Sequence, residues 1–207
     1  MNKIYIIKLL ECMKDIMAEN KDYLTELDSI VGDGDLGLTM SDGFAAAYNA
    51  TKDFEEDDIG KLLYTGGKAM SIAVPSTMGT LMASGFMNAG KAYKGITELK
   101  IDDIVKIFEA YMDGVSARGK AKVGEKTFLD GMAPAIQALN LSLRNGDRLE
   151  QLANNAAVAA EEGYKNTATM VAVHGRAATR GEASRALQDP GAAVAMLMMQ
   201  AFDNSTK

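Results

Sequence analysis

The chain has 207 residues, which is enough for one sizeable hydrophobic core or for a small pair of domains. Hydrophobic residues make up 47% and charged residues 24%, and this balance excludes the disordered and collagen-like classes. The formal net charge of -6 argues against non-specific binding of nucleic acid, because such binding needs a basic surface. A single cysteine, Cys12, cannot form an internal disulfide, so we expect a reducing compartment, the cytoplasm.

The N-terminus has no targeting pattern, because charged residues from Lys8 onward interrupt the apolar run at residues 4–7. The uncharged stretch at residues 69–90 is long enough to span a bilayer. It contains Pro75 and several serine and threonine residues, so we interpret it as a buried helix broken by a polar turn. We therefore expect no contact with a membrane.

Apolar residues recur at helical spacing through most of the chain. This pattern predicts eight helices, over residues 3–20, 40–50, 57–73, 78–92, 102–117, 130–143, 147–165 and 190–203. In the first of them, Ile4, Ile7 and Leu10 are predicted to share one face. Strand evidence is limited to two short runs, residues 29–31 and 170–173. We expect one all-α domain that covers residues 1–207.

Four segments interrupt the helical pattern, and each is rich in glycine or charge: residues 28–37, 74–79, 118–126 and 174–191. Loops on a rigid scaffold often carry function, so the candidate functional residues are sought in these segments.

The first segment interleaves three aspartates with three glycines: Asp28, Asp33, Asp35, Gly32, Gly34 and Gly37. Glycine permits a positive φ, so the backbone can fold back and bring the three carboxylates to one point. Three carboxylates repel one another unless a cation lies between them, and oxygen ligands favour a hard ion such as Mg²⁺. The alternative is an acidic turn whose aspartates cap a helix that starts near Leu38.

Two other motifs share part of this pattern. The glycines match the spacing of the dinucleotide-binding fingerprint, but the required βαβ context is absent and the aspartates would face the pyrophosphate. The start Asp33-x-Asp35 is that of an EF-hand loop, but its sixth position is Leu38 and its twelfth is Phe44. We exclude both motifs.

Residues 118–127 form a basic, glycine-punctuated segment that could supply cations and backbone N–H groups to phosphates; the alternative is a solvated charged loop. Gly175-Arg176 comes later, and residues 188–191 (Gln-Asp-Pro-Gly) combine a turn signal with a helix-entry signal. His174 is the only histidine and has no evident nucleophile as partner, so we expect no catalytic role for it.

Three of these motifs, in order and spacing, resemble the nucleotide-binding L subunit of dihydroxyacetone kinases (the DhaL family). They are Leu27-Asp28…Val31-Gly32-Asp33-Gly34-Asp35-x-Gly37, Arg118-Gly119-Lys120-Ala121…Gly124-x-Lys126-Thr127 and Gly175-Arg176-Ala177…Gly181-Glu182…Gln188-Asp189-Pro190-Gly191. The resemblance extends along nearly the whole chain. It implies a closed barrel of about eight antiparallel, amphipathic helices with the nucleotide site at one end.

By this resemblance Asp28, Asp33 and Asp35 hold two Mg²⁺ ions that bridge the phosphates of ADP or ATP. The positions that match the nucleotide contacts of the family are Leu36, Gly37, Leu38, Thr39, Thr77, Met78, Gly119, Phe128, Arg176, Asp189, Pro190 and Gly191. Phosphoryl transfer consists mostly of positioning and charge neutralisation, so no protein nucleophile is required on this chain. Arg176 would support the transfer.

The resemblance also implies partners. In the family a separate K subunit holds the ketose covalently on its own histidine, and this chain would deliver the γ-phosphoryl group. In phosphotransferase-system versions ADP stays bound and an M subunit, fed from phosphoenolpyruvate, rephosphorylates it; this is the expected version. The alternatives are an ATP-dependent kinase subunit with exchanging nucleotide and a nucleotide-sensing regulator of a transcription factor. Fatty-acid kinases share a related signature but fuse it to domains for which this chain has no room.

The chain departs from the family pattern at two places. Leu36 stands where the family commonly has histidine, and residues 75–81 read Pro-Ser-Thr-Met-Gly-Thr-Leu instead of Gly-Gly-x-Ser-Gly-Pro-Leu. Fewer glycines and a lost serine hydroxyl change the approach of the backbone to phosphates. We interpret these changes as a sign of a paralogue whose partner binds another short ketose, such as a ketotetrose.

Overall fold

The computed structural model describes residues 1–207, which form nine α-helices and two 3₁₀ segments and no strand. The α-helices are α1 (Lys3–Glu19), α2 (Lys21–Val31), α3 (Leu36–Asn49), α4 (Ile59–Ala73), α5 (Thr77–Ala92), α6 (Ile101–Gly119), α7 (Phe128–Asn145), α8 (Leu149–Asn166) and α9 (Pro190–Ser205). The 3₁₀ segments are η1 (Thr167–Thr169) and η2 (Arg176–Ser184). None of the helices has both the length and the apolar character that crossing a membrane requires.

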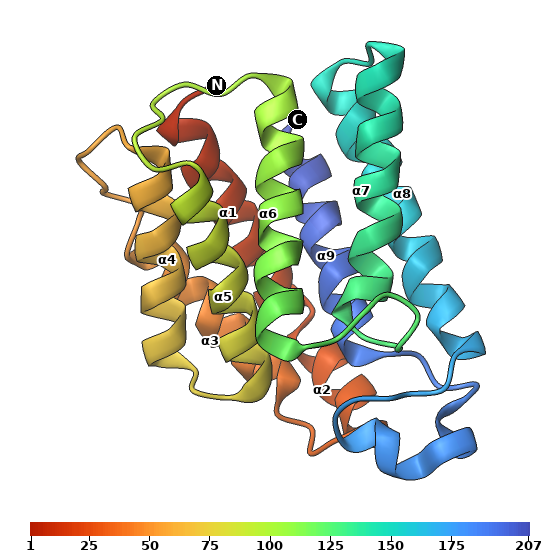
Figure 1. The fold of residues 1–207 in the computed structure, drawn as a ribbon. Coiled ribbons are helices and arrows are strands. Elements are labelled where there is room, and N and C mark those ends of the chain that lie inside the picture. Colours follow the sequence, from red (N-terminus) through yellow and green to blue (C-terminus); the bar gives the residue numbers. More distant parts are fainter.

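Eight of the α-helices form a closed ring (Figure 1). α1 packs against α3, each helix from α3 to α8 packs against the next one in the chain, and α9 packs against α1 and closes the ring. Neighbouring helices run in opposite directions, and α2 lies at one end of the ring against α3 and α9. The predicted all-α class and the closed barrel of about eight antiparallel helices are confirmed.

The inside of the ring is filled by one hydrophobic core of 49 buried residues. Burial of these apolar side chains is the main force that holds the amphipathic helices together. In α1 the buried stripe includes Ile6, Leu10, Met13 and Met17. The predicted face was wrong at Ile4, which is 67% exposed, because the true stripe runs through Ile6 rather than Ile4.

The chain differs from the predicted elements around the first acidic segment and before α9. Residues 21–31, for which no helix was predicted, form α2, a short helix of which only Leu24 and Val31 are buried. α3 begins at Leu36 rather than near residue 40. Of the two strand candidates, residues 29–31 are the last turn of α2 and residues 170–173 are irregular.

The direction of the helices decides where the loops gather. α3, α5, α7 and α9 all run the same way, so their N-termini meet at one end of the barrel (Figure 1). The segments that precede these helices, residues 32–35, 74–76, 120–127 and 170–189, lie at that end, whereas the two chain termini lie at the other. An alternating ring therefore brings segments far apart in sequence to one place.

Candidate functional site

A cleft of about 780 Å³ opens at the loop-bearing end of the barrel. The first residues of α3, α5, α7 and α9 line it, together with the ends of α2 and α6 and residues 174–177. The N-terminus of a helix presents free backbone N–H groups and the positive end of the helix dipole. A cleft surrounded by four such ends favours an anionic ligand.

Three carboxylates form one wall of this cleft. Side-chain oxygens of Asp28, Asp33 and Asp35 lie within 4.8 Å of one another. Asp28 belongs to the last turn of α2 rather than to a loop, and the other two follow in the turn that leads into α3. Gly34 makes this turn possible with a φ of 75°, and its N–H donates to Asp28 Oδ2 at 2.9 Å. The structure thus brings the three aspartates together.

The alternative, in which the aspartates cap α3, fails at the N-cap residue itself, whereas Asp28 does accept from backbone N–H groups before and at the start of α3. Asp35 occupies the N-cap position of α3, but its side chain makes no capping hydrogen bond. Burial raises the pKa of Asp28, and the negative charges of Asp33 and Asp35 raise it further, against the effect of the N–H groups of Leu36 and Gly34. A divalent cation between the carboxylates would relieve this repulsion, and a donor set made only of oxygen fits Mg²⁺.

Arg176 lies beside the acidic cluster, with its Nη2 donating to Asp33 Oδ2 at 2.5 Å. It belongs to a segment, residues 170–188, that we call the strap, which consists of η2 and the irregular backbone on both sides of it. Ala172 and Ala177 of the strap pack against Val31 of α2. The strap therefore lies against the end of α2 and contacts the acidic turn through Arg176.

The basic segment at residues 118–127 has cations in three environments. Arg118 lines the cleft, whereas Lys120 and Lys122 are exposed and do not line it. Lys126 is only 2% exposed. Its Nζ donates to three carbonyl oxygens of the strap, those of Met170, Ser184 and Leu187. The expectation that this segment supplies cations to phosphates is thus unsupported for Lys126, whose three N–H groups are already used.

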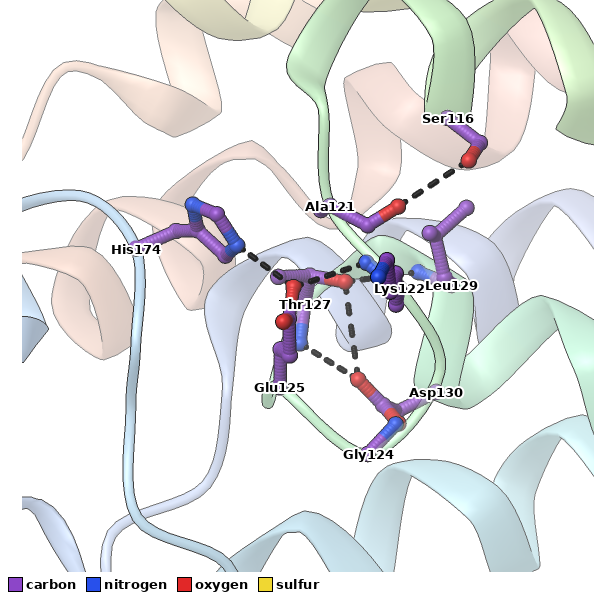
Figure 2. Close-up of polar contacts among 9 residues, drawn as sticks. All are labelled: Ser116, Ala121, Lys122, Gly124, Glu125, Thr127, Leu129, Asp130 and His174. Atoms are coloured by element: carbon purple, nitrogen blue, oxygen red, sulfur yellow. Dashed lines mark hydrogen bonds and ion pairs between the residues drawn. The ribbon is translucent and has the colours of Figure 1, made fainter.

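His174 joins the strap to the turn before α7. Its Nε2 lies 2.6 Å from Glu125 Oε2, and a dashed line in Figure 2 marks this contact. The hydrogen bond from His174 lowers the pKa of Glu125, and the N–H of Lys122, at 2.8 Å from the same carboxylate, lowers it as well. No nucleophilic side chain contacts His174. The contact therefore links the strap to the turn before α7 and has a structural role.

Asp130, in the first turn of α7, binds the backbone of the same turn (Figure 2). It is buried, and its two oxygens accept from the N–H of Gly124 at 2.5 Å and the N–H of Thr127 at 2.7 Å. The second bond is half of a capping box at the start of α7. Residues 120–127 are thereby held rigidly against the helix.

Asp189 caps α9 at the edge of the cleft. Its Oδ2 accepts from the N–H of Ala192 at 2.7 Å, and its own N–H donates to Thr167 Oγ1 at 3.0 Å. Burial raises its pKa from 3.8 to about 7, although the N–H of Ala192 and the charge of Lys126 act to lower it. The helix-entry signal of Asp-Pro-Gly is confirmed. Asp58 caps α4 in the same way, because its side chain accepts from the N–H of Lys61.

Most of the predicted nucleotide-contacting residues lie together. Those that line the cleft are Leu36, Thr77, Met78, Gly119, Phe128, Arg176, Asp189, Pro190 and Gly191. Gly37, Leu38 and Thr39 do not line it. A Cβ at Gly37 would lie 2.0 Å from the carbonyl oxygen of Lys21, so this glycine allows α3 to approach α2 closely. Leu38 is half exposed and Thr39 is buried.

The expected nucleotide contacts did not include several residues of the cleft, among them Ser76, Thr80, Leu81, Val115 and Arg118, although Arg118 belongs to the basic segment expected to supply cations. Ser76 carries a signal, because serine is a preferred N-cap and its side chain accepts from the N–H of Gly79. Arg118 ends a helical pattern just before the glycine-punctuated segment. The other three lie within helices, where nothing in their spacing separates a cleft position from a core position.

Comparisons with known proteins place this barrel in the class of kinase and phosphotransferase subunits. A family model described as the DAK2 domain matches residues 30–204, and the chain belongs to that family. It is 33% identical over 200 residues to the PEP-dependent dihydroxyacetone kinase, ADP-binding subunit DhaL, of Escherichia coli (strain K12), with 97% of this chain and 95% of the relative covered. The resemblance to the DhaL family drawn from three motifs is confirmed.

Longer relatives and solved structures agree with this assignment. An L-erythrulose 1-kinase of Mycolicibacterium smegmatis is 30% identical over 199 residues, which cover 95% of this chain and 34% of that protein. The crystal structure of the dihydroxyacetone kinase of C. freundii in its native form matches with a TM-score of 0.74 at 20% identity, over 97% of this chain and 34% of that chain. Another structure of that kinase, in complex with AMP-PNP and Mg²⁺, matches with a TM-score of 0.73. These likenesses establish the barrel fold.

Proposed function

We propose that this chain is the nucleotide-binding subunit of a dihydroxyacetone-type kinase. It binds ADP or ATP with two Mg²⁺ ions at the cleft and passes the γ-phosphoryl group to dihydroxyacetone or a similar short ketose, which a partner K subunit holds. An M subunit fed from phosphoenolpyruvate recharges the bound ADP. The names of the relatives support this proposal, because the DhaL subunits of Escherichia coli and Listeria innocua are both described as PEP-dependent and ADP-binding.

The observation that carries the proposal is the convergence of opposite charges at one end of the barrel. Three clustered carboxylates stand beside four helix N-termini and the guanidinium group of Arg176. A simple anion would be repelled by the carboxylates, and a lone metal ion would not need the helix dipoles. A polyphosphate bound to a divalent metal ion fits both features, because the metal ion would contact the carboxylates and the phosphates would face the helix N-termini.

The acidic cluster fits Mg²⁺ by its chemistry. Asp28, Asp33 and Asp35 offer only oxygen atoms, and burial among like charges already disfavours the ionised form of Asp28. When bound there, Mg²⁺ would bridge phosphate oxygens and neutralise the charge that develops during transfer. The expected nucleotide contacts at the first turns of α3, α5, α7 and α9 would orient the phosphates against this wall.

The remaining residues position the nucleotide. Arg176 and Arg118 add positive charge at the rim, while Leu81, Val115 and Phe128 give the cleft an apolar side suited to a base. No nucleophilic side chain contacts His174, which agrees with transfer by positioning and charge neutralisation alone. The single free cysteine, Cys12, fits a cytoplasmic location.

An ATP-dependent ketose kinase is the second candidate, because two relatives act on erythrulose by name. The L-erythrulose 1-kinase of M. smegmatis and the L-erythrulose kinase of Pectobacterium atrosepticum are both 30% identical over 199 residues. This chain spans 34% and 32% of those proteins, respectively. They favour a ketotetrose as an alternative substrate, which the departures at Leu36 and residues 75–81 also suggest.

Native mass spectrometry of the purified chain in Mg²⁺, followed by a challenge with labelled ATP, tests the proposal. Bound ADP with two Mg²⁺ that resists exchange is the expected result, and it identifies a carrier that is recharged in place. Ready exchange with labelled ATP would favour the ATP-dependent candidate instead. Absence of any bound nucleotide would contradict both versions.

A further inference from the structure

Lys126 is a buried cation for which the proposed function has no role. Its side chain is 2% exposed, and its backbone has a φ of 61°, a left-handed conformation that residues with a side chain rarely adopt. Burial of an ammonium group is costly unless hydrogen bonds and an opposite charge compensate for lost water. The partners of this amine therefore indicate what it does.

The amine of Lys126 holds the two ends of the strap together. It donates to the carbonyl oxygens of Ser184 and Leu187, each at 2.6 Å, and to that of Met170 at 3.2 Å. Met170 begins the strap, while the other two residues belong to its end. Because an ammonium group has three donors, this arrangement uses all of them.

A buried carboxylate supplies the opposite charge. Burial lowers the pKa of Lys126, the negative charge of Asp189 acts to raise it, and the positive charge of Arg185 lowers it. Asp189 follows the strap and caps α9. The environment of Lys126 thus joins the strap, the turn before α7 and the start of α9.

Other contacts also hold the strap. The N–H of Ala172 donates to the buried Ser184 Oγ at 2.9 Å and so joins both ends of the strap, and the N–H of Val173 donates to Glu125 O at 3.3 Å. Arg180 donates to the carbonyl oxygen of Ile30 in α2.

Arg176 pairs with Asp33 and His174 pairs with Glu125, but both pairs are partly exposed, and exposed ion pairs contribute little stability. The small apolar contact with Val31 of α2 involves Ala172 and Ala177 in the first half of the strap and Leu187 near its end. Lys126 is thus a buried side chain from outside the strap that bonds to the backbone at both of its ends.

We propose that Lys126 is a positioning residue: by hydrogen-bonding to the backbone at both ends of the strap, it places Arg176 at the cleft, where Arg176 meets the anionic ligand. The ligand, a nucleoside diphosphate with Mg²⁺, rests on the proposed function, whereas the hold of Lys126 on the strap does not. Lys126 also lines the cleft, but its three N–H donors are used by carbonyl groups of the strap, so it acts through Arg176 rather than by donating to the ligand.

The first test removes only the amine. Lys126→Met keeps the length of the side chain, and Lys122→Met, at an exposed position of the same turn outside the cleft, is the matched control. Without ligand, we expect trypsin to cleave after Arg176, Arg180 and Arg185 about tenfold faster in Lys126→Met, because three carbonyl groups lose their donor. Calorimetry should show about tenfold weaker binding of Mg-ADP, with the control within about twofold of the wild type.

A double-mutant cycle separates positioning from a general loss of stability. If Lys126 acts through Arg176, Lys126→Met should weaken Mg-ADP binding less than about threefold further in an Arg176→Ala background. Mn²⁺ binding without nucleotide, followed by electron paramagnetic resonance, should stay within about threefold of the wild type, because the three aspartates lie off the strap. Additive losses of Mg-ADP affinity would overturn the proposal.

Failure of the proposed function can be distinguished from failure of the positioning role of Lys126. If the wild type binds no Mg-ADP, the proposed function fails, but proteolysis still tests whether Lys126 holds the strap. Unchanged cleavage in Lys126→Met would show that Lys126 does not hold the strap. If Lys126→Met does not fold, Lys126→Gln takes its place, because an amide can serve two of the three carbonyl groups. For Lys126→Gln we then expect about threefold faster cleavage by trypsin and about threefold weaker binding of Mg-ADP. Unchanged cleavage and affinity in this variant would overturn the proposal.

Discussion

Arg176 Nη2 lies 2.5 Å from Asp33 Oδ2, across 143 positions of the sequence. This contact joins the strap to the acidic cluster and pairs one proposed metal ligand with one proposed phosphate contact. In the proposed function, the guanidinium group and a metal ion would therefore compete for the carboxylate of Asp33. Arg176 contributes to the site in two opposite ways, and the two can be measured apart.

Replacement of Arg176 by alanine should affect metal and nucleotide in different directions. We expect Mg-ADP affinity to fall by about tenfold, because a charge-assisted contact with phosphate is lost. Affinity for Mn²⁺ without nucleotide should be unchanged or up to about threefold higher, because a competing cation is removed from an exposed carboxylate. Calorimetry and electron paramagnetic resonance measure the two affinities.

Arg144→Ala is the control, since Arg144 is exposed near the end of α7 that is remote from the cleft. Neither affinity should change in that variant. Equal losses of Mn²⁺ and Mg-ADP affinity in Arg176→Ala would contradict separate roles for the arginine and the carboxylates.

Two helical glycines should respond to alanine with opposite signs. At Gly37 a Cβ would meet Lys21 O at 2.0 Å and Thr25 Oγ1 at 2.3 Å, so Gly37→Ala forces α3 away from α2 and should cost about 1–3 kcal/mol of unfolding free energy. At Gly66 the nearest atoms lie at 3.6 Å, and Gly66→Ala should stabilise the protein by about 0.5–1 kcal/mol. Urea denaturation followed by circular dichroism measures both.

The result bears on the role of Gly37 in the site. A loss of stability fits a packing role at the helix contact beside the acidic turn. Unchanged stability together with a loss of Mg-ADP affinity would instead favour a direct contact of Gly37 with the nucleotide.

The two aspartate caps should give the stability opposite dependences on pH. Burial raises the pKa of Asp189 from 3.8 to about 7, so the folded protein binds this proton more tightly than the unfolded chain, and stability is lost as the pH rises between these values. An asparagine side chain at this position would not titrate. The Tm of Asp189→Asn relative to the wild type should therefore increase from about pH 5 to about pH 8.

Asp58→Asn is the comparison. Desolvation acts to raise the pKa of Asp58, but the N–H groups of Lys61 and Gly95 outweigh it and leave the pKa lowered. Its stabilisation is thus present above 3.8 and is lost as the pH falls below that value. The deficit in Tm of Asp58→Asn should shrink in acid. Parallel pH profiles for the two variants, from scanning calorimetry, would contradict the assignment of Asp189 as a buried, reluctantly ionised cap.

The helical pattern could predict the all-α class because the long helices each bury an apolar face, whereas the closed barrel was expected from the family resemblance. α2 escaped prediction because it buries only Leu24 and Val31. The start of α3 was placed too late because Gly37 suggests a turn, whereas the structure uses it for close packing of two helices. Such contacts depend on the partner helix, which local sequence does not specify.

The candidate site shows the same division. The convergence of Asp28, Asp33 and Asp35 follows from glycines in their own segment, so the motif contained the necessary information. The burial of the Lys126 side chain does not follow from its own segment, because its hydrogen-bond partners are carbonyl groups of the strap, about 60 positions further along the chain. A lysine next to glycines and other cations is predicted to be exposed and to bind phosphate. Only the fold shows that Lys126 is buried and bonded to the strap.

Calorimetric titration of ADP in the presence and absence of Mg²⁺, on the wild type and Asp33→Asn, tests the central claim most directly. Asp42→Asn, which removes an exposed carboxylate of α3 outside the cleft, is the control. We predict Mg²⁺-dependent binding of ADP that is at least about tenfold weaker in Asp33→Asn and unchanged in Asp42→Asn. Equal affinity in the wild type and Asp33→Asn, or binding that does not depend on Mg²⁺, would contradict a metal-nucleotide site at the acidic cluster.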